Sequence, residues 1–196
     1  MIVKKGRFTL YEKTPLARTV PISYFGGPVR LQKRETARVA TAKGERKRLQ
    51  TLAVPTDTEI LDICKEGEDQ IYEFKAAGTE IRKLTKEIAA MLHTRQGGII
   101  FYGVDDDGTI QGSDVRRQKF DQPLQNSVKN SISPAAMVTL KSVVVMGTEV
   151  LVIVVPPWNR RDVYQFDEKV FIRKGTNVFA AKPEELRKLH RGEYVV

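Results

Sequence analysis

The chain has 196 residues and a net charge of +9, and its 41% hydrophobic and 29% charged residues are typical of a globular protein. Its longest apolar run, Val150 to Pro157, is too short to cross a bilayer, and the charged N-terminus lacks the apolar run of a signal peptide. A single cysteine excludes an internal disulfide framework. These features predict an intracellular, cytoplasmic protein with no membrane partner, or a nuclear one if its source is eukaryotic.

Charge is distributed unevenly along the chain. Residues 1–50 contain 13 Lys and Arg but only three Glu, a balance of +10 that leaves −1 for residues 51–196. We therefore predict a basic N-terminal extension, residues 1–54, attached to a near-neutral domain, residues 55–196. Such asymmetry is typical of proteins with a polyanionic partner, and the absence of an apolar helix face favours nucleic acid over membrane. A solvated tail that only aids solubility is the alternative. The candidate phosphate-binding residues of the extension are Arg34, Arg38, Lys43, Arg46, Lys47 and Arg48.

The extension has two parts. Apolar and aromatic residues between Arg7 and Phe25, punctuated by prolines, predict one or two short strands. The segment 32–50 has few large apolar residues and clustered cations, so we expect it to be mobile or to order only on binding.

The first half of the domain reads as a βαβ unit. A short helix starts with the cap residues of "TDTEILDICKEG" and ends at Gly67, and an alternating strand follows at 70–76. Thr79 is predicted to cap a second helix, which stops at Gly97-Gly98 before the buried strand "GIIFYGV". The "DDDGT" segment predicts a tight turn, with a short strand at Ile110.

The second half reads as a helix, two hairpins and a final helix. Asp121 and Pro123 mark the expected start of the first helix, which Pro134 closes. A hairpin turns at Gly147, and its second strand is apolar on both faces, which predicts a central strand. A second hairpin is expected in "DVYQFDEKVFIRKG", and a helix in "KPEELRKLHRG". The fold class is therefore an α/β (α+β) sandwich around one mixed sheet.

Four segments of the domain resemble one known family. "EDQIYEFK", "EIAAMLHTRQGGIIFYGVDDDGTIQG", "VLVIVVPPW" and "VFIRKGTNVFAAKPEEL" resemble the Alba-like domain of Schlafen proteins and their microbial relatives, from about Glu66 to Leu189. The E-F-K, Gly-Gly and G-V-D-D-x-G elements occur in the family's order and spacing. The chain departs from the family pattern at Met91-Leu92-His93, where Phe-Ala-Asn is usual, and at "GTNVFAA".

The resemblance implies an Alba-like, nucleic-acid-binding fold. In the family's eukaryotic members it implies a metal-dependent endoribonuclease that acts on structured RNA such as tRNA, through three carboxylates. These carboxylates map to Glu68, Glu73 and Asp106, which would hold Mg²⁺ or Mn²⁺. RNA is a more natural partner than DNA on this resemblance. Eukaryotic Schlafens pair two such lobes in one chain, so a homodimer or a second Schlafen-like lobe is expected here.

The chemistry supports these acids unequally. Phosphodiester hydrolysis uses a hard cation held by oxygen ligands. If the two strands of the βαβ unit are parallel, Glu73 and Asp106 lie near the same edge of the sheet. Glu68 joins them only if residues 67–70 fold back, because five extended residues span about 16 Å. The alternatives are a solvent-exposed acid at Glu68 and a turn acid at Asp106.

Several other residues have two interpretations. Lys75 lies on the same strand face as Glu73, as in nucleases with an E-x-K pair, although a surface ion pair is the alternative. Arg160 and Arg161 form a second cationic loop beside Trp158, which either stacks on a base or covers a hydrophobic edge. Gly97-Gly98 is a helix stop rather than a phosphate cradle. Cys64 is expected in the core, and both histidines at the surface or at helix ends.

Two classes of function remain open from the sequence. In the first, the protein is a nucleic-acid-binding nuclease with catalytic residues Glu68, Glu73, Asp106 and Lys75. In the second, it is a non-catalytic nucleic-acid-binding or regulatory module, or an assembly protein that docks by its basic arm. Converging carboxylates would favour the nuclease, and acids capped by local backbone would favour the binding module.

Overall fold

A computed structural model describes residues 51–195, which fall within one compact unit. The strands predicted between residues 7 and 25 and the six candidate phosphate-binding residues between Arg34 and Arg48 lie outside the described residues.

The centre of the domain is a four-stranded mixed sheet with strand order β1-β2-β5-β4. Strands β1 (Tyr72–Lys75) and β2 (Gly98–Tyr102) are parallel, and helix α4 (Ile81–Met91) connects them. Strand β5 (Thr148–Val155) pairs antiparallel with both β2 and β4 (Thr139–Val145). The mixed sheet with its βαβ unit is confirmed, and β5 is central as its apolar faces predict.

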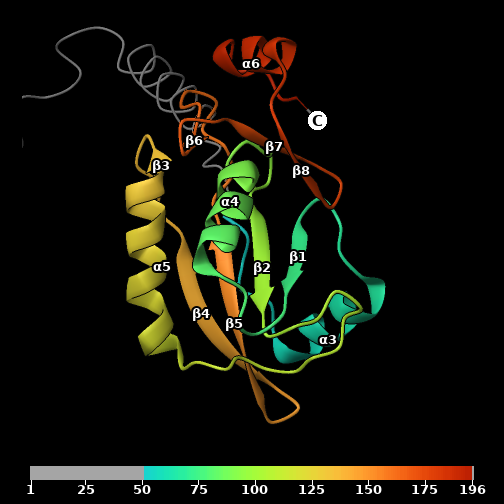
Figure 1. The fold of residues 1–196 in the computed structure, drawn as a ribbon. Coiled ribbons are helices and arrows are strands. Elements are labelled where there is room, and N and C mark those ends of the chain that lie inside the picture. Colours follow the sequence, from blue (N-terminus) through green and yellow to red (C-terminus); the bar gives the residue numbers. More distant parts are fainter. Residues whose placement is uncertain (1–50, 196) are drawn as a thin grey trace, which may run out of the picture. The chain divides into compact units, whose positions relative to one another are not determined.

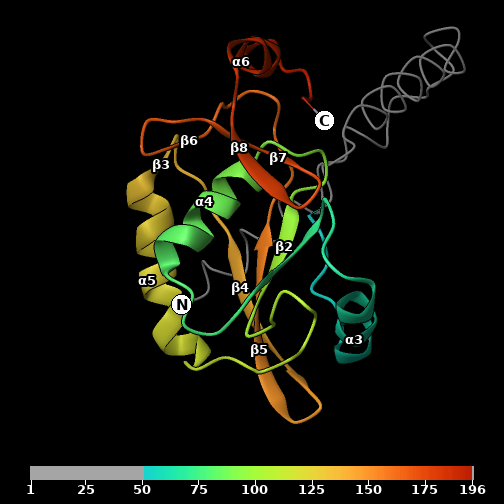
Figure 2. The same ribbon diagram turned by 45° about the vertical axis from the view of Figure 1, so that its right-hand side comes forward.

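Helices cover both faces of the sheet (Figures 1 and 2). On one face, α4 and α5 (Arg117–Ser131) bury the larger apolar cluster, which includes Leu84, Leu124 and Ile153. On the other face, α3 (Asp57–Glu66) packs through Ile60 and Cys64 onto Phe74, Phe101 and Val152. Successive side chains of β1 point to opposite faces of the sheet, so each one faces either α4 or α3.

Local sequence signals account for most helix and turn boundaries. Thr56 and Glu59 form a reciprocal capping box at the start of α3, with the Thr56 amide 2.7 Å from the Glu59 carboxylate. Gly97 has a φ of +80°, and a side chain there would overlap the Val155 carbonyl, so Gly97-Gly98 provides a close strand approach. The predicted helix stop at this pair is wrong, because α4 already ends at Met91, with Leu92 as its C-cap.

Two other predicted boundaries are wrong. Helix α5 begins at Arg117, not at Asp121 or Pro123, because Phe120, Leu124 and Val128 form one buried stripe that extends the apolar face. The N-cap of α4 is Glu80, since the Thr79 hydroxyl instead donates to the Ala76 carbonyl at 2.8 Å.

The second hairpin lies further along the chain than predicted. It joins β7 (Phe171–Lys174) to β8 (Asn177–Ala180), ahead of helix α6 (Pro183–His190). In the predicted segment, Gln165–Phe166 forms β6, which pairs with β3 (Ile132–Ser133). Asp167 and Glu168 adopt positive φ and form a tight turn between Phe166 and Lys169, which are joined by an isolated β-bridge.

No helix between residues 51 and 195 is both long enough and apolar enough to cross a membrane.

Candidate functional site

The loop before β1 folds back on itself. Asp69 Oδ1 accepts hydrogen bonds from the amides of Ile71 and Tyr72, both at 2.7 Å, and the Asp69 amide donates to the Tyr72 carbonyl at 3.2 Å. A side chain that bonds to its own downstream amides is the usual Asp contribution to a tight turn. The fold-back that Glu68 would need in order to approach Glu73 is therefore present.

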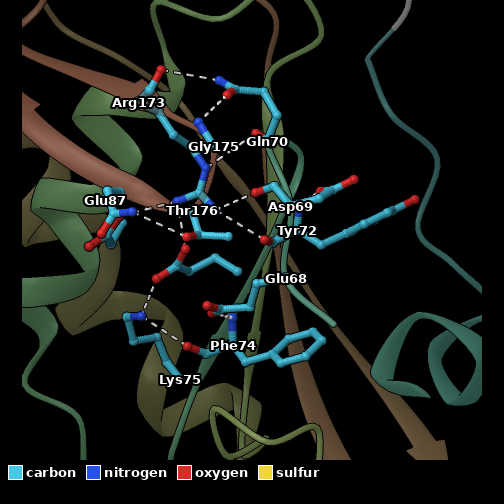
Figure 3. Close-up of polar contacts among 12 residues, drawn as sticks. Glu68, Asp69, Gln70, Tyr72, Phe74, Lys75, Glu87, Arg173, Gly175 and Thr176 are labelled. Carbon is cyan, nitrogen blue, oxygen red and sulfur yellow. Dashed lines mark hydrogen bonds and ion pairs between the residues drawn. The ribbon is translucent and has the colours of Figure 1, made fainter. Parts of the chain in front are cut away.

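Arg173 on β7 connects this loop to the sheet, about one hundred residues away in sequence (Figure 3). Its guanidinium donates to the carbonyls of Gln70 at 3.2 Å, Asp69 at 2.7 Å and Tyr72 at 3.0 Å. A third nitrogen, Nη1, lies 2.5 Å from Glu73 Oε2. The Arg173 side chain is fully buried, and these contacts satisfy its fork of donors.

Glu73 is buried on the face of the sheet that α4 covers, and cations take both of its oxygens. Oε2 pairs with Arg173, and Oε1 pairs with Lys75, two residues along the same strand face. The Glu73 side chain is 4% exposed and that of Lys75 is 20% exposed. The E-x-K pair is thus a mostly buried ion pair, and Glu73 has no oxygen free of a cation.

Glu87 is a third acid of this cluster, and sequence reasoning missed it. Its Oε2 lies 3.5 Å from Arg173 Nη1, is buried and accepts no hydrogen bond. Burial, with the Glu73 charge in addition, raises the pKa of Glu87 to about 7, although Lys75, Arg173 and Lys86 act in the opposite direction. In the sequence, the signal for a buried Glu87 was its position directly before Ile88, which belongs to the buried stripe of α4.

The raised pKa of Glu87 predicts a pH-dependent effect of the substitution Glu87→Gln. The charged carboxylate carries a burial penalty that is absent below pH 4.5, grows as the pH rises and is complete above about pH 7. Urea unfolding at pH 8 should therefore show the variant to be more stable than wild type by about 3 kcal/mol. The difference should vanish at pH 4.

An exposed carboxylate on α6 provides the matched control. Glu184→Gln removes the same charge and should show no such pH-dependent difference. A constant stability difference for Glu87→Gln across this pH range would contradict the assignment.

Glu68 is held by the local backbone. Its Oε1 accepts from the Phe74 amide at 2.6 Å, and the side chain lies in a half-buried position. Burial raises the pKa of the Glu68 carboxyl and the nearby Glu73 charge adds to this effect, while the bond from Phe74 opposes it. Glu68 thus lies beside Glu73, but with one oxygen already used as a cap.

Asp106 lies in the turn after β2 and is exposed. The Asp105 amide donates to the Thr109 carbonyl, and the Gly108 amide donates to the Asp105 carbonyl. The Asp107 side chain also closes the turn, because it accepts from the Thr109 amide at 2.8 Å. A side chain at Gly108 would overlap the Cys64 carbonyl, so this turn packs against α3. Glu73 instead lies on the face of the sheet that α4 covers. Two residues near the same edge of a sheet can therefore lie on different faces of it.

The carboxylates do not form a recognisable metal site. Among residues 51–195, no group of three or more His, Cys, Asp or Glu side chains is arranged to hold a metal ion. Cations take both Glu73 oxygens, an amide takes one Glu68 oxygen, and Asp106 belongs to the turn against α3. The arrangement does not fit the divalent ion that the predicted triad requires.

Two residues with aromatic rings turn out to be core residues. The Trp158 side chain is fully buried and its Nε1 donates to the Asp162 carbonyl at 2.6 Å, so it covers the core and offers no face to a base. His93, predicted at the surface or a helix end, is 5% exposed. Its Nδ1 donates to the Phe171 carbonyl at 2.8 Å, and its Nε2 accepts from the Tyr164 amide at 2.9 Å. Burial lowers the pKa of His93 to about 4.

Arg160 and Arg161 are both exposed, on the loop that follows β5. His190 is exposed at the end of α6, and Cys64 is buried, as predicted.

The domain is an α+β fold built on a mixed sheet. The Arg173–Glu73 pair joins β7 to β1, and the Gly-Gly pair packs against the end of β5. The family model described as "Schlafen, AlbA_2" matches residues 68–182. The chain therefore belongs to the Schlafen AlbA_2 family, as the resemblance in its sequence suggests.

Solved structures show more distant similarity. The crystal structure of the DIP2311 protein from Corynebacterium diphtheriae matches 65% of this chain at 22% identity and a TM-score of 0.48, but only 25% of its own length is covered. A solution NMR structure from Nitrosomonas europaea, the N-terminal domain of a protein named for its relation to the DNA helicase RecG, matches 53% of this chain. The match covers 74% of that domain, at 20% identity and a TM-score of 0.45. The comparison with curated proteins gave no match.

Proposed function

We propose that the protein is a nucleic-acid-binding member of its family, with RNA as the favoured partner, and that its buried acids stabilise the fold. The observation that carries this proposal is the pairing of Glu73 with both Arg173 and Lys75. A carboxylate with a cation on each oxygen links β1 to β7 and has its buried charge compensated within the fold.

The charge balance supports the choice of partner. The protein has a net charge of +9, with +10 in residues 1–50 and −1 in residues 51–196, and family membership is consistent with nucleic-acid binding. Lys and Arg side chains that contact phosphates give affinity without sequence preference. We expect binding to be strong at low salt and to weaken steeply as salt is added.

Fluorescence anisotropy with labelled single-stranded RNA and DNA tests this proposal. The full chain is compared with a variant in which Arg34, Arg38, Lys43, Arg46, Lys47 and Arg48 are all glutamine. Because each lost contact with single-stranded nucleic acid reduces the salt slope by about 0.7, the slope should become shallower by up to about 4. Unmeasurable binding by the wild type at low salt would refute the proposal.

Metal-dependent RNA cleavage is the second candidate function. The observation in its favour is the folded-back loop, which brings Glu68 to the backbone beside Glu73. Incubation of tRNA and of single-stranded DNA with Mn²⁺ or EDTA separates the two candidates. We expect both substrates to be recovered intact. Mn²⁺-dependent cleavage by wild type that is lost in Glu68→Gln would establish the nuclease instead.

A further inference from the structure

Three segments distant in sequence meet around Tyr194. They are the loop Thr94–Gly97 after α4, the loop Trp158–Asp162 after β5, and the C-terminal residues 191–195. The Trp158 amide donates to the Thr94 carbonyl at 3.0 Å, and Arg160 Nε donates to the Gly192 carbonyl at 2.7 Å. The buried Trp158 ring meets the Tyr194 ring edge-on, with centroids 5.6 Å apart. These contacts fix the three segments relative to one another.

Two arginines lie against the Tyr194 ring. The guanidinium carbon of Arg95 is 5.0 Å from the ring centroid, and that of Arg160 is 5.5 Å away. A guanidinium held on an aromatic ring loses less conformational freedom when it binds an anion. Arg160 also adopts a φ of +61°, which is unusual for a residue with a side chain and recurs at functional positions. The cations are thus positioned before any ligand arrives.

Within residues 51–195, these cations have no ion-pair partner. Arg95, Arg160 and Arg161 are exposed, and none has a carboxylate within 4 Å in the described part of the chain. The acids nearby have other partners, since Glu193 pairs with Arg191 at 2.8 Å and Asp162 accepts from the Asn159 side chain at 2.6 Å. A cationic cluster without ion-pair partners among the described residues, on a domain of net charge −1, is a local feature and not a reflection of overall charge.

A small cavity opens beside this cluster. It has a volume of about 190 Å³, and its lining includes Gln70, Arg95, Gln96 and Val195. This is below the roughly 300 Å³ at which sites for drug-sized ligands begin, so it has room for a group the size of a phosphate. The amides of Arg95 and Gln96 donate to no acceptor among residues 51–195. Donors of this kind beside cations suit an oxyanion.

We propose that Arg95 and Arg160, which lie against the Tyr194 ring, bind the phosphodiester backbone of nucleic acid together with Arg161, the next residue of the same loop, with one phosphate at the mouth of the cavity. We call these three arginines and the tyrosine the Tyr194 surface. The inference rests on the proposed function and assigns it a place on the folded domain, separate from the basic extension. Because two guanidinium groups lie against the Tyr194 ring, we expect the surface to contact phosphates and not to stack on bases.

A charge-matched pair of variants of the full chain tests the assignment. Arg95, Arg160 and Arg161 are replaced by glutamine in one protein. Three exposed cations of the α5 region, Arg116, Lys119 and Lys129, are replaced by glutamine in the other. The net charge is then identical, so any difference reports position. With single-stranded RNA, the first variant should show a salt slope shallower by about 2, and at least tenfold weaker binding. The control should keep the wild-type slope.

The outcomes distinguish the two levels of proposal. Equal slopes for the two variants, with binding by wild type intact, would overturn the Tyr194 surface while leaving the proposed function in place. Failure of wild type to bind RNA or DNA would overturn both. Because Arg160 also bonds to Gly192, the single variant Arg161→Gln provides a test without that contact. Its salt slope should be shallower by about 0.7.

Discussion

Replacing Arg173 with methionine is expected to lower the free energy of unfolding by about 3–5 kcal/mol. The substitution leaves the Glu73 carboxylate buried with Lys75 as its remaining partner. It also removes the donors that satisfy the carbonyls of Asp69, Gln70 and Tyr72. An unpaired buried charge and unsatisfied carbonyls both carry large desolvation costs. Urea unfolding followed by the fluorescence of the single tryptophan, which is buried, measures the change.

Two further variants show whether the loss of stability comes from the Arg173 network. Arg187→Met, at an exposed position of α6, removes the same charge and should change stability by less than about 0.5 kcal/mol. The double variant with Glu73→Leu and Arg173→Met removes both members of the pair and should recover part of the loss. Equal effects of Arg173→Met and Arg187→Met would contradict a structural role for the Arg173 network.

His93 should make the stability of the protein depend on pH by about 3 kcal/mol. Burial lowers the pKa of its imidazole from 6.5 to about 4, while the bond to the Phe171 carbonyl acts in the opposite direction. The unfolded chain therefore binds a proton at a higher pH than the folded one. The stabilisation is present above about pH 6.5 and is lost as the pH falls through about 4. Glu87 has the opposite slope over a similar range, so wild type alone would show partial cancellation.

The substitution His93→Gln isolates this effect, because a glutamine amide can both donate to Phe171 and accept from the Tyr164 amide. The difference in unfolding free energy between wild type and His93→Gln should shift by about 3 kcal/mol between pH 7 and pH 4, to the detriment of wild type. His190→Gln, at the exposed histidine, is the control and should show no shift. A constant difference between wild type and His93→Gln would mean that the folded protein accepts the proton readily.

The motifs that identify the family acquire a physical meaning from the structure. The glutamate of E-F-K and the arginine of the "IRKG" segment are separate signals in the sequence, and Glu73 and Arg173 form one buried ion pair. The Gly-Gly motif lies at the start of β2, where the chain passes against the end of β5. Both motifs therefore have a structural role in packing the domain.

The sequence was informative wherever a structure depends on neighbours along the chain. The helix cap before α3, the hairpin turn at Gly147 and the apolar β5 strand all follow from local backbone hydrogen bonding or from periodic burial. It was less reliable where a tertiary contact overrides a local signal. Pro123 indicated a helix start, yet packing of Phe120 against the core extends α5 past it.

By itself the sequence determined the class of fold, the family and the uneven distribution of charge, since these follow from periodicity, motif order and composition. Only the tertiary structure decided what each charged side chain does. Glu73 is neutralised by a residue one hundred positions away, Glu87 joins it from α4, and Asp106 stays in a turn against α3. The physical reason is that desolvation and ion pairing depend on distance in space, which local sequence patterns do not specify.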